Sequence, residues 1–176
     1  MRGGLYARVI ALAFGHAAAV TLEQLADAAA ASGAQGVRIA PGRALIVVGL
    51  TRTSATTFTA AAERLGFITR ADDPRRHVIA CAGAPICASA HIAARAMAPC
   101  IAEIAAPYLD DSFKIHVSGC AKGCAHAAPA ALTVVGTPAG CALVANGSAR
   151  VEPFDVVAAD QLPAAILKAA GEARHV

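Results

Sequence analysis

Four of the six cysteines occur as two spaced pairs, and each of the four lies within two residues of glycine or proline. Five residues separate Cys81 from Cys87, and three separate Cys120 from Cys124. Thiolates are soft ligands that hold iron–sulfur clusters, and a cubane cluster takes four of them. These spacings differ from those of zinc ribbons and of bacterial ferredoxins. The pairs therefore predict two loops that bind one [4Fe–4S] cluster, with four buried free thiols as the alternative.

The other two cysteines, Cys100 and Cys141, are predicted to be buried and to bind no metal. Cys100 stands in an alanine-rich helical pattern and Cys141 in an apolar, strand-like run, and free cysteine is among the most buried residue types. Disulfides are not expected, because Arg8 interrupts the apolar run near the start of the chain and argues against an export signal. We therefore expect a cytoplasmic setting, in which thiols stay reduced.

Composition narrows the classes of partner. The chain has 176 residues, enough for one ordinary domain or two small ones. Its longest segment without Asp, Glu, Lys or Arg, 123–149, contains Pro129 and Pro138, so no membrane-spanning helix is expected. The net charge is +3, with neither a basic run nor an aromatic stacking set, which argues against nucleic acid. Most basic residues are arginine, which suits an acidic small molecule, although scattered solvated arginines explain the composition equally well.

The first half of the chain reads as a β-α-β-β-α-β unit, the split-βαβ or ferredoxin-like pattern. Thr21 and Gln24 have capping-box spacing at the start of the first helix. Val37 and Ile39 alternate with Arg38, which predicts a half-buried strand. The expected strands are 5–14, 37–39, 44–50 and 67–69, and the expected helices are 21–33 and 54–66.

A charged segment with a proline, 72–76, separates two predicted domains, 1–71 and 77–176. The fold class is therefore predicted to be α+β. A ferredoxin-like half is followed by an α/β half that carries the paired cysteines. We find no internal repeat that would change this division into two halves.

In the second half, strands should run directly into Cys81 and Cys120, and loops at strand ends can hold ligands in a fixed geometry. A long helix should begin near Cys87 and be kinked or split at Pro99. His116 should point outward from its strand, opposite two apolar neighbours. The expected strands are 78–80, 114–118, 131–136 and 141–145, the expected helices are 87–106 and 160–171, and a short helical turn is expected at 124–128.

Together these features resemble the nitrite and sulfite reductase superfamily, in which a [4Fe–4S] cluster abuts siroheme. Local segments are similar to one branch of it, the precorrin-3B synthases of aerobic cobalamin synthesis. Sulfite reductases usually carry Pro-Asn between the cysteines of the second pair, where this chain has Ala121-Lys122. The segments that carry the resemblance are RIAPGRAL at 38–45, CAGAP at 81–85 and HVSGCAKGCAH at 116–126.

The resemblance implies a nitrite/sulfite reductase-type 4Fe–4S domain and only part of a complete enzyme. A full member has two ferredoxin-like and two cluster-type halves around a pseudo-twofold axis, with the tetrapyrrole between them. This chain resembles the second, C-terminal half. The implied partners are a second half, from another chain or a second copy, and an electron donor. The implied reaction is oxygen-dependent hydroxylation and lactonisation of precorrin-3A, with NADH as ultimate reductant, the cluster as electron relay and a non-haem iron that activates oxygen.

The resemblance also suggests roles for charged side chains, because the tetrapyrrole substrate carries many carboxylates that need cationic partners. Lys122 lies between two cluster ligands, and Arg43 follows the turn at Pro41-Gly42. Arg38 is a weaker candidate, since an outward strand position is usually only solvated. His126 and His91 are candidate iron ligands, although a helix-surface or capping role is the stronger interpretation for each. No catalytic residue is assigned.

Three functions compete at this stage. The first is a monooxygenase-type iron–sulfur oxidoreductase half of the precorrin-3B synthase kind. The second is half of a siroheme-dependent sulfite or nitrite reductase. The third is a non-catalytic iron–sulfur or zinc module that serves a partner protein.

Overall fold

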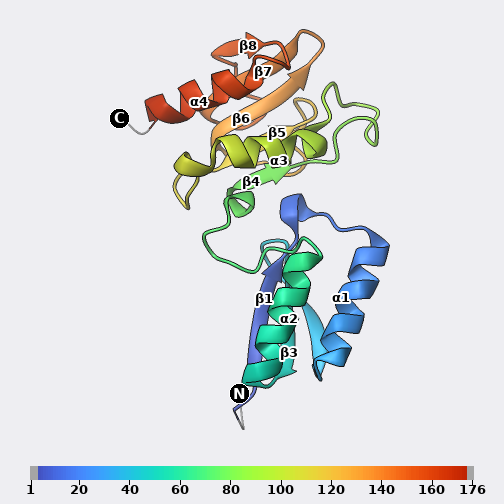
Figure 1. Cartoon of the computed structure of the whole chain (residues 1–176). Helices are drawn as coiled ribbons and strands as arrows, with labels where there is room; N and C mark the ends of the chain where they lie inside the picture. The colour runs from blue at the N-terminus through green and yellow to red at the C-terminus, as the bar shows by residue number, and fades with distance from the viewer. Residues whose placement is uncertain (1–3, 174–176) are drawn as a thin grey trace. The chain divides into compact units, whose positions relative to one another are not determined.

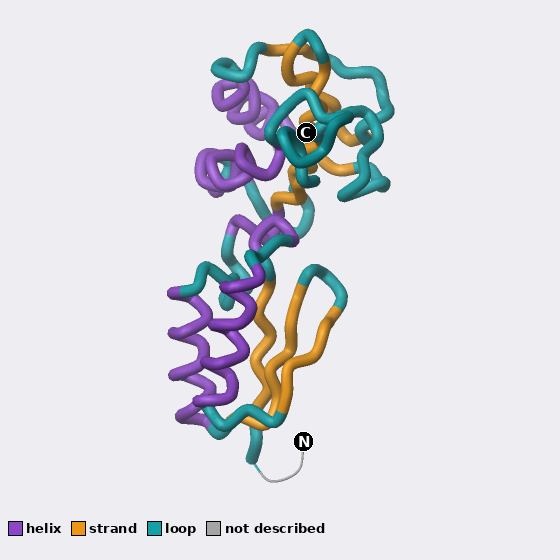
Figure 2. The backbone as a smooth tube through the Cα atoms, turned by 90° about the vertical axis from the view of Figure 1, so that its right-hand side faces the viewer, coloured by secondary structure: helices purple, strands orange, loops and turns teal. Residues whose placement is uncertain are grey.

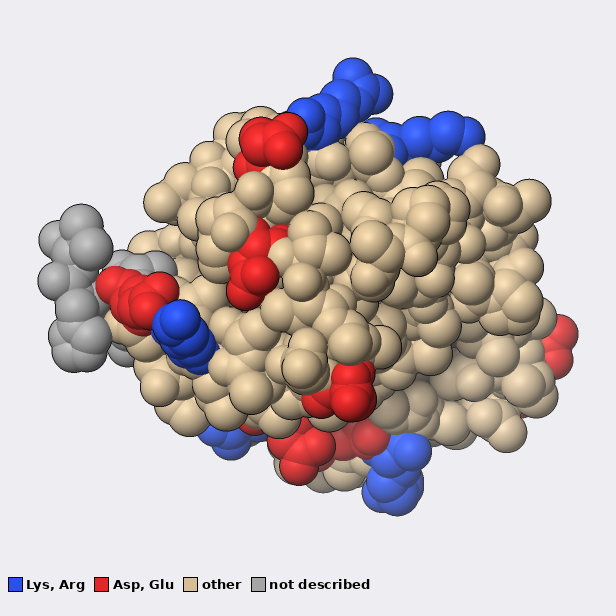
Figure 3. Space-filling view, turned by 90° about the horizontal axis from the view of Figure 1, so that it is seen from above, with Lys and Arg blue, Asp and Glu red and all other residues tan. Residues whose placement is uncertain are grey.

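The computed structural model describes residues 4–173 and divides into two compact units, one ending at Arg76 and the other beginning at His77 (Figure 1). Both units combine helices with a β-sheet, as the α+β prediction requires. No helix among residues 4–173 has the length and apolar character needed to cross a lipid bilayer. On the face shown in Figure 3, lysine and arginine side chains are few and do not gather into a broad basic patch.

The first unit contains a three-stranded antiparallel sheet in the order β1-β3-β2. Ile68 forms an isolated antiparallel bridge to Ala11 on the other edge of β1. With this bridge, the four extended segments lie in the order of the split-βαβ pattern that the sequence predicts. The elements are β1 (Tyr6–Ala11), α1 (Ala19–Ala31), β2 (Gly36–Ala40), β3 (Ala44–Leu50) and α2 (Arg52–Arg64).

The core of this unit lies between the sheet and the two helices, which cover the same face of the sheet (Figure 2). Phe58 of α2 and Leu25 of α1 pack with Ile10, Val47 and Leu50 of the strands, and each of these side chains is at most 2% exposed. Burying a side chain of this size contributes about 1.5–3 kcal/mol. The apolar spacing of the two helices is therefore what fixes them on the sheet.

Two local predictions in this unit are wrong. The first helix begins at Ala19, and Ala18 caps it without a side-chain hydrogen bond, so Thr21 and Gln24 form no capping box. The second wrong prediction is that β2 is half-buried, since Val37 is 42% and Ile39 91% exposed. Because β2 is an edge strand, its outer side chains are not covered by the helices, and alternation alone did not reveal this.

The second unit contains a five-stranded sheet in the order β4-β5-β6-β7-β8. Strands β4, β5 and β6 are parallel, and β7 and β8 continue the sheet in antiparallel fashion. Strand β8 was not predicted from the sequence. The elements are β4 (Val78–Ala80), α3 (Ala94–Ile104), β5 (Ile115–Ser118), β6 (Ala130–Thr137), β7 (Gly140–Gly147), β8 (Asp155–Val157) and α4 (Leu162–Ala173).

The helical predictions for this unit need three corrections. Helix α3 begins only at Ala94, so Cys87 lies in a loop rather than at a helix start. The helix continues through Pro99, which does not split it. The segment 124–128 forms turns without a helix. The effect of proline on a helix depends on the surrounding hydrogen bonds as well as on its own backbone limits.

Candidate functional site

The two cysteine-bearing loops begin at the same edge of the second sheet. Cys81 directly follows β4, and Cys120 lies two residues beyond the end of β5. Strands β4 and β5 are parallel neighbours, with Val78 opposite Ile115. The carboxyl ends of adjacent parallel strands lie side by side, and ligand sites of α/β sheets form there. The fold therefore brings together two loops that are far apart in the sequence.

Hydrogen bonds join these loops directly. The Gly119 amide donates to Cys81 Sγ at 3.1 Å, and the Gly119 carbonyl accepts from the His91 amide at 2.8 Å. Lys122 Nζ lies 2.9 Å from Ser89 Oγ, so the second loop is also tied to the first by a side chain. Two hydrogen bonds of the Gly119 backbone and one between side chains therefore hold the two loops together.

Two glycines allow close packing around the cysteines, Gly119 between the two loops and Gly83 between the first loop and the start of α3. A Cβ on Gly119 would lie 2.7 Å from Ala90 Cβ and 3.4 Å from Cys81 Sγ. A Cβ on Gly83 would lie 2.3 Å from the Ala94 nitrogen, and Gly83 also has a φ of +67°, in the left-handed region that favours glycine. No larger residue fits at either position without movement of the backbone around the cysteines.

The thiols differ in exposure. Cys81 and Cys120 are half-buried, Cys87 and Cys124 are exposed, and all are free. Within residues 4–173, no three His, Cys, Asp or Glu side chains form a group that could hold a metal ion. The four thiolates of a cubane cluster bind four different irons, so they lie further apart than the ligands of one ion. Thiol donors on two hydrogen-bonded loops fit such a cluster. The four cysteines therefore remain predicted ligands.

The remaining two cysteines behave differently from each other. Cys141 is buried in β7, as predicted, and burial raises the pKa of its thiol. Cys100 is exposed, so the prediction that it fills the core is wrong. The helical pattern around Cys100 is real, but α3 turns this position toward solvent. Alanine-rich helices make such errors easy, because alanine is compatible with both faces of a helix.

His116 is fully buried, which contradicts its predicted outward orientation. It lies in β5, and a parallel strand inside a sheet is covered on both faces. Burial, followed by the charge of His126, lowers the pKa of His116 to about 4, so its imidazole is neutral at pH 7. Its ring packs edge-on against His126 at 5.7 Å between centroids. Neither ring nitrogen of His116 has a hydrogen-bond partner among the described residues.

Lys122 lines a cavity of about 180 Å³ beside the second cysteine loop. His126, Ser148 and Arg150 also line it, and the Gly123 backbone forms part of the wall. The sequence offered no reason to single out Arg150, because it lies 26 positions after Cys124 and belongs to no motif. The cavity therefore presents two permanent cations and a histidine, a combination suited to an anionic group.

The other predicted binding residues lie in the first unit. Arg43 is half-buried in the turn between β2 and β3, with a φ of +62°. Arg38 is exposed on β2, consistent with a solvated side chain. His91 is exposed in the first cysteine loop. The structure thus brings the predicted residues Lys122 and His126 together at one cavity, and His91 of the same unit does not line that cavity.

Comparisons with known proteins confirm the resemblance. The chain is 41% identical over 144 residues to a precorrin-3B synthase of a Sinorhizobium species, covering 82% of this chain and 31% of that protein. Its fold is similar to that of the NirA protein of Mycobacterium tuberculosis, with a TM-score of 0.72 and 20% identity over 93% of this chain and 34% of that chain. The chain matches no protein-family model. It thus spans about a third of the length of each of these two proteins.

Proposed function

We propose that this chain, a sequence relative of precorrin-3B synthase with the fold of NirA, is the C-terminal half of an iron–sulfur oxidoreductase that acts on precorrin-3A. The identity of 41% over 144 residues carries the proposal. The two cysteine loops, which are hydrogen-bonded to each other at one edge of the sheet, support it. The proposed reaction is oxygen-dependent hydroxylation and lactonisation of the tetrapyrrole in aerobic cobalamin synthesis.

Cys81, Cys87, Cys120 and Cys124 would hold a [4Fe–4S] cluster in this proposal. Such a cluster supplies single electrons, which the resemblance traces to NADH through a separate electron donor. The chain itself contributes the thiolates and the amide of Gly119 that hydrogen-bonds Cys81 Sγ. Gly119 also lets the two loops meet, and Gly83 lets the first loop pack on the start of α3. A cytoplasmic, reducing compartment would suit these exposed and half-buried thiols. The ligands of the proposed non-haem iron are left unassigned.

The substrate's carboxylates would meet cationic side chains of this chain. Lys122 and Arg150 both line the 180 Å³ cavity beside the second cysteine loop. His116, which packs against His126, is neutral at pH 7 and adds no positive charge to that of Lys122 and Arg150. The cavity would therefore orient an acidic edge of the tetrapyrrole beside the cysteine loops.

A complementary half is part of the proposal, since this chain covers 31% of the precorrin-3B synthase it matches. That half would come from another chain or from a second copy of this one. It would supply the remaining cationic groups around the tetrapyrrole. Neither nucleic acid nor a membrane is needed in this scheme.

A second candidate function, half of a siroheme-dependent sulfite or nitrite reductase, is favoured by one observation, the NirA-like fold. The identity to precorrin-3B synthase is twice that to NirA, which is why we place this function second. A non-catalytic iron–sulfur module is a third possibility. Absorption spectra separate the first two, because siroheme has strong visible bands that an iron–sulfur cluster alone lacks.

Turnover tests the proposed function. Anaerobically prepared chain should form no lactone product from precorrin-3A and oxygen by itself, because only one side of the tetrapyrrole site is present. Adding the complementary half, with a reductant, should produce the hydroxylated lactone, detected by mass as the gain of one oxygen atom. Sulfite or nitrite reduction by the same mixture, without this product, would instead establish the second function.

Lys122→Ala should weaken tetrapyrrole binding in the reconstituted complex by about tenfold to a hundredfold. This change in affinity corresponds to the loss of one charge-assisted hydrogen bond. The cluster absorbance should stay unchanged. Ser89→Ala is the matched control, because it removes the hydrogen-bond partner of Lys122 in the first loop and keeps the charge of Lys122. Equal losses in the two variants would mean that Lys122 acts by joining the loops and not by binding the ligand.

A further inference from the structure

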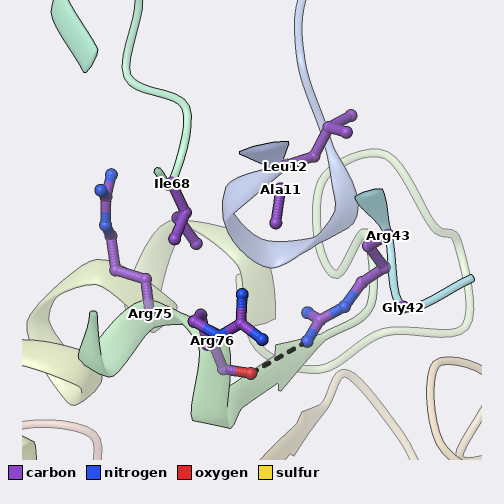
Figure 4. A pocket seen from close by; sticks show the side chains of 7 residues that line it. All are labelled: Ala11, Leu12, Gly42, Arg43, Ile68, Arg75 and Arg76. Carbon is purple, nitrogen blue, oxygen red and sulfur yellow. Dashed lines mark hydrogen bonds between the residues drawn. The ribbon is translucent and has the colours of Figure 1, made fainter. Parts of the chain in front are cut away.

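A small polar hollow lies within the first unit, which contains no cysteine. It has a volume of about 50 Å³ and lies where the turn after β2 meets the segment before β4. Figure 4 shows Arg43 and Arg76 converging on it from these two segments, while the guanidinium of Arg75 points away. Leu12 and Ile68 form its apolar wall.

Arg43 is held in place from several sides. Its φ of +62° is uncommon for a residue with a side chain, and such strain concentrates at functional sites. Its carbonyl accepts a hydrogen bond from the Leu12 amide at 2.8 Å, and its guanidinium donates to the Arg76 carbonyl at 3.2 Å. A Cβ on Gly15 would lie 3.0 Å from Arg43 Cδ, so the stem of the side chain packs on that glycine. The guanidinium is therefore oriented before any ligand arrives.

Two cationic side chains, those of Arg43 and Arg76, line the hollow together. Burial, followed by the nearby charge of Arg76, lowers the pKa of Arg43. The acidic residues of this segment are already engaged, Asp72 with Arg70 and Asp73 with Arg75. Within residues 4–173, Arg76 forms no ion pair with a carboxylate. Two guanidiniums held close together repel each other, and an anion between them would remove that cost.

We propose that Arg43 and Arg76 form a binding site for a single oxyanion, the carboxylate or phosphate group of a ligand. A cavity of this kind needs about 10–15 Å³ for one water molecule, so 50 Å³ accommodates one such group and not a ring system. Two guanidiniums supply parallel N–H donors that match the oxygens of either anion. This site is separate from the cavity at Lys122 and does not depend on the proposed function.

The experiment uses the full chain and its arginine side-chain Nε–H resonances, titrated with acetate or inorganic phosphate at constant ionic strength, with chloride as the balancing ion. Arg43 and Arg76 should shift saturably, with a Kd on the order of 1–10 mM. Arg76→Gln should weaken binding about tenfold. Arg64→Gln, which removes the same charge from the exposed end of α2, should not.

The anion that binds more tightly identifies the ligand group. Tighter binding of acetate indicates a carboxylate ligand, as on a tetrapyrrole, and tighter binding of phosphate indicates a phosphorylated one. Arg43→Lys keeps the positive charge but loses the paired N–H donors of the guanidinium, so it should also weaken binding about tenfold. Equal shifts with chloride, or equal affinity in the Arg76→Gln and Arg64→Gln variants, would overturn the site. Since neither cluster nor tetrapyrrole is used, that outcome would leave the proposed function standing.

Discussion

Serine in place of any one of Cys81, Cys87, Cys120 or Cys124 is expected to abolish or strongly deplete the iron–sulfur cluster of the anaerobically prepared protein. Wild-type chain should contain about four iron and four sulfide per molecule, because four thiolates hold one cubane cluster. Losing one ligand exposes an iron corner, so the cluster becomes unstable. Iron and sulfide analysis, together with the absorbance near the thiolate charge-transfer bands, measures the effect.

The other two cysteines provide the controls. Cys100→Ser changes an exposed side chain of α3, and Cys141→Ala changes a buried one in β7. Both variants should keep the full cluster. The Cys141 variant should lose about 1 kcal/mol of stability from its cavity. Stoichiometric zinc without sulfide in the wild-type chain would contradict the cluster assignment and point to a zinc module.

Gly83→Ala is expected to destabilise the second unit by about 2–5 kcal/mol and to prevent cluster assembly. The added methyl group would overlap the Ala94 nitrogen at 2.3 Å, and the backbone there has a φ of +67°. Overpacking typically costs about 1–3 kcal/mol and a left-handed residue with a side chain about 1–2 kcal/mol more. Urea unfolding of the chain with and without reconstituted cluster measures both effects.

Gly66→Ala separates the two contributions. Gly66 has a φ of +85°, and a Cβ there would meet no atom within 4 Å. This variant should therefore lose only the conformational part, about 1–2 kcal/mol, with normal cluster content. If Gly83→Ala proved no more costly than Gly66→Ala, the close packing of the first cysteine loop on α3 would not be what positions Cys81 and Cys87.

Much of the fold was predictable from local patterns. The strand 44–50 was predicted with the bounds that β3 has, and the turn and helix signals around it gave the split-βαβ order. The predicted start of α2, at residue 54, is later than its start in the structure at Arg52. Thr51, not Ser54, is the cap, and the two residues form a reciprocal box with hydrogen bonds of 3.0 and 3.1 Å. Hydroxyl residues follow one another here, and only the geometry of the first turn decides which one caps it.

Burial was harder to predict than secondary structure. The strand at 115–118 was expected, yet its position between two parallel neighbours buries His116 as fully as Ile115. Cys100 and Ile39 show the opposite error, since each belongs to a correctly predicted element and is exposed. An alternating or helical pattern describes one element, whereas burial depends on which elements cover it.

The sequence by itself determined which residues are predicted to carry the chemistry. These are two cysteine pairs at the ends of predicted strands, in segments similar to those of precorrin-3B synthases. Only the tertiary structure decided what those residues meet. The bond from Gly119 to Cys81 spans 38 positions, and Arg43 meets Arg76 across 33. Local sequence patterns indicate the secondary structure of short segments. Contacts between residues more than 30 positions apart depend on the order of the strands and on packing, and a short segment carries no information about either.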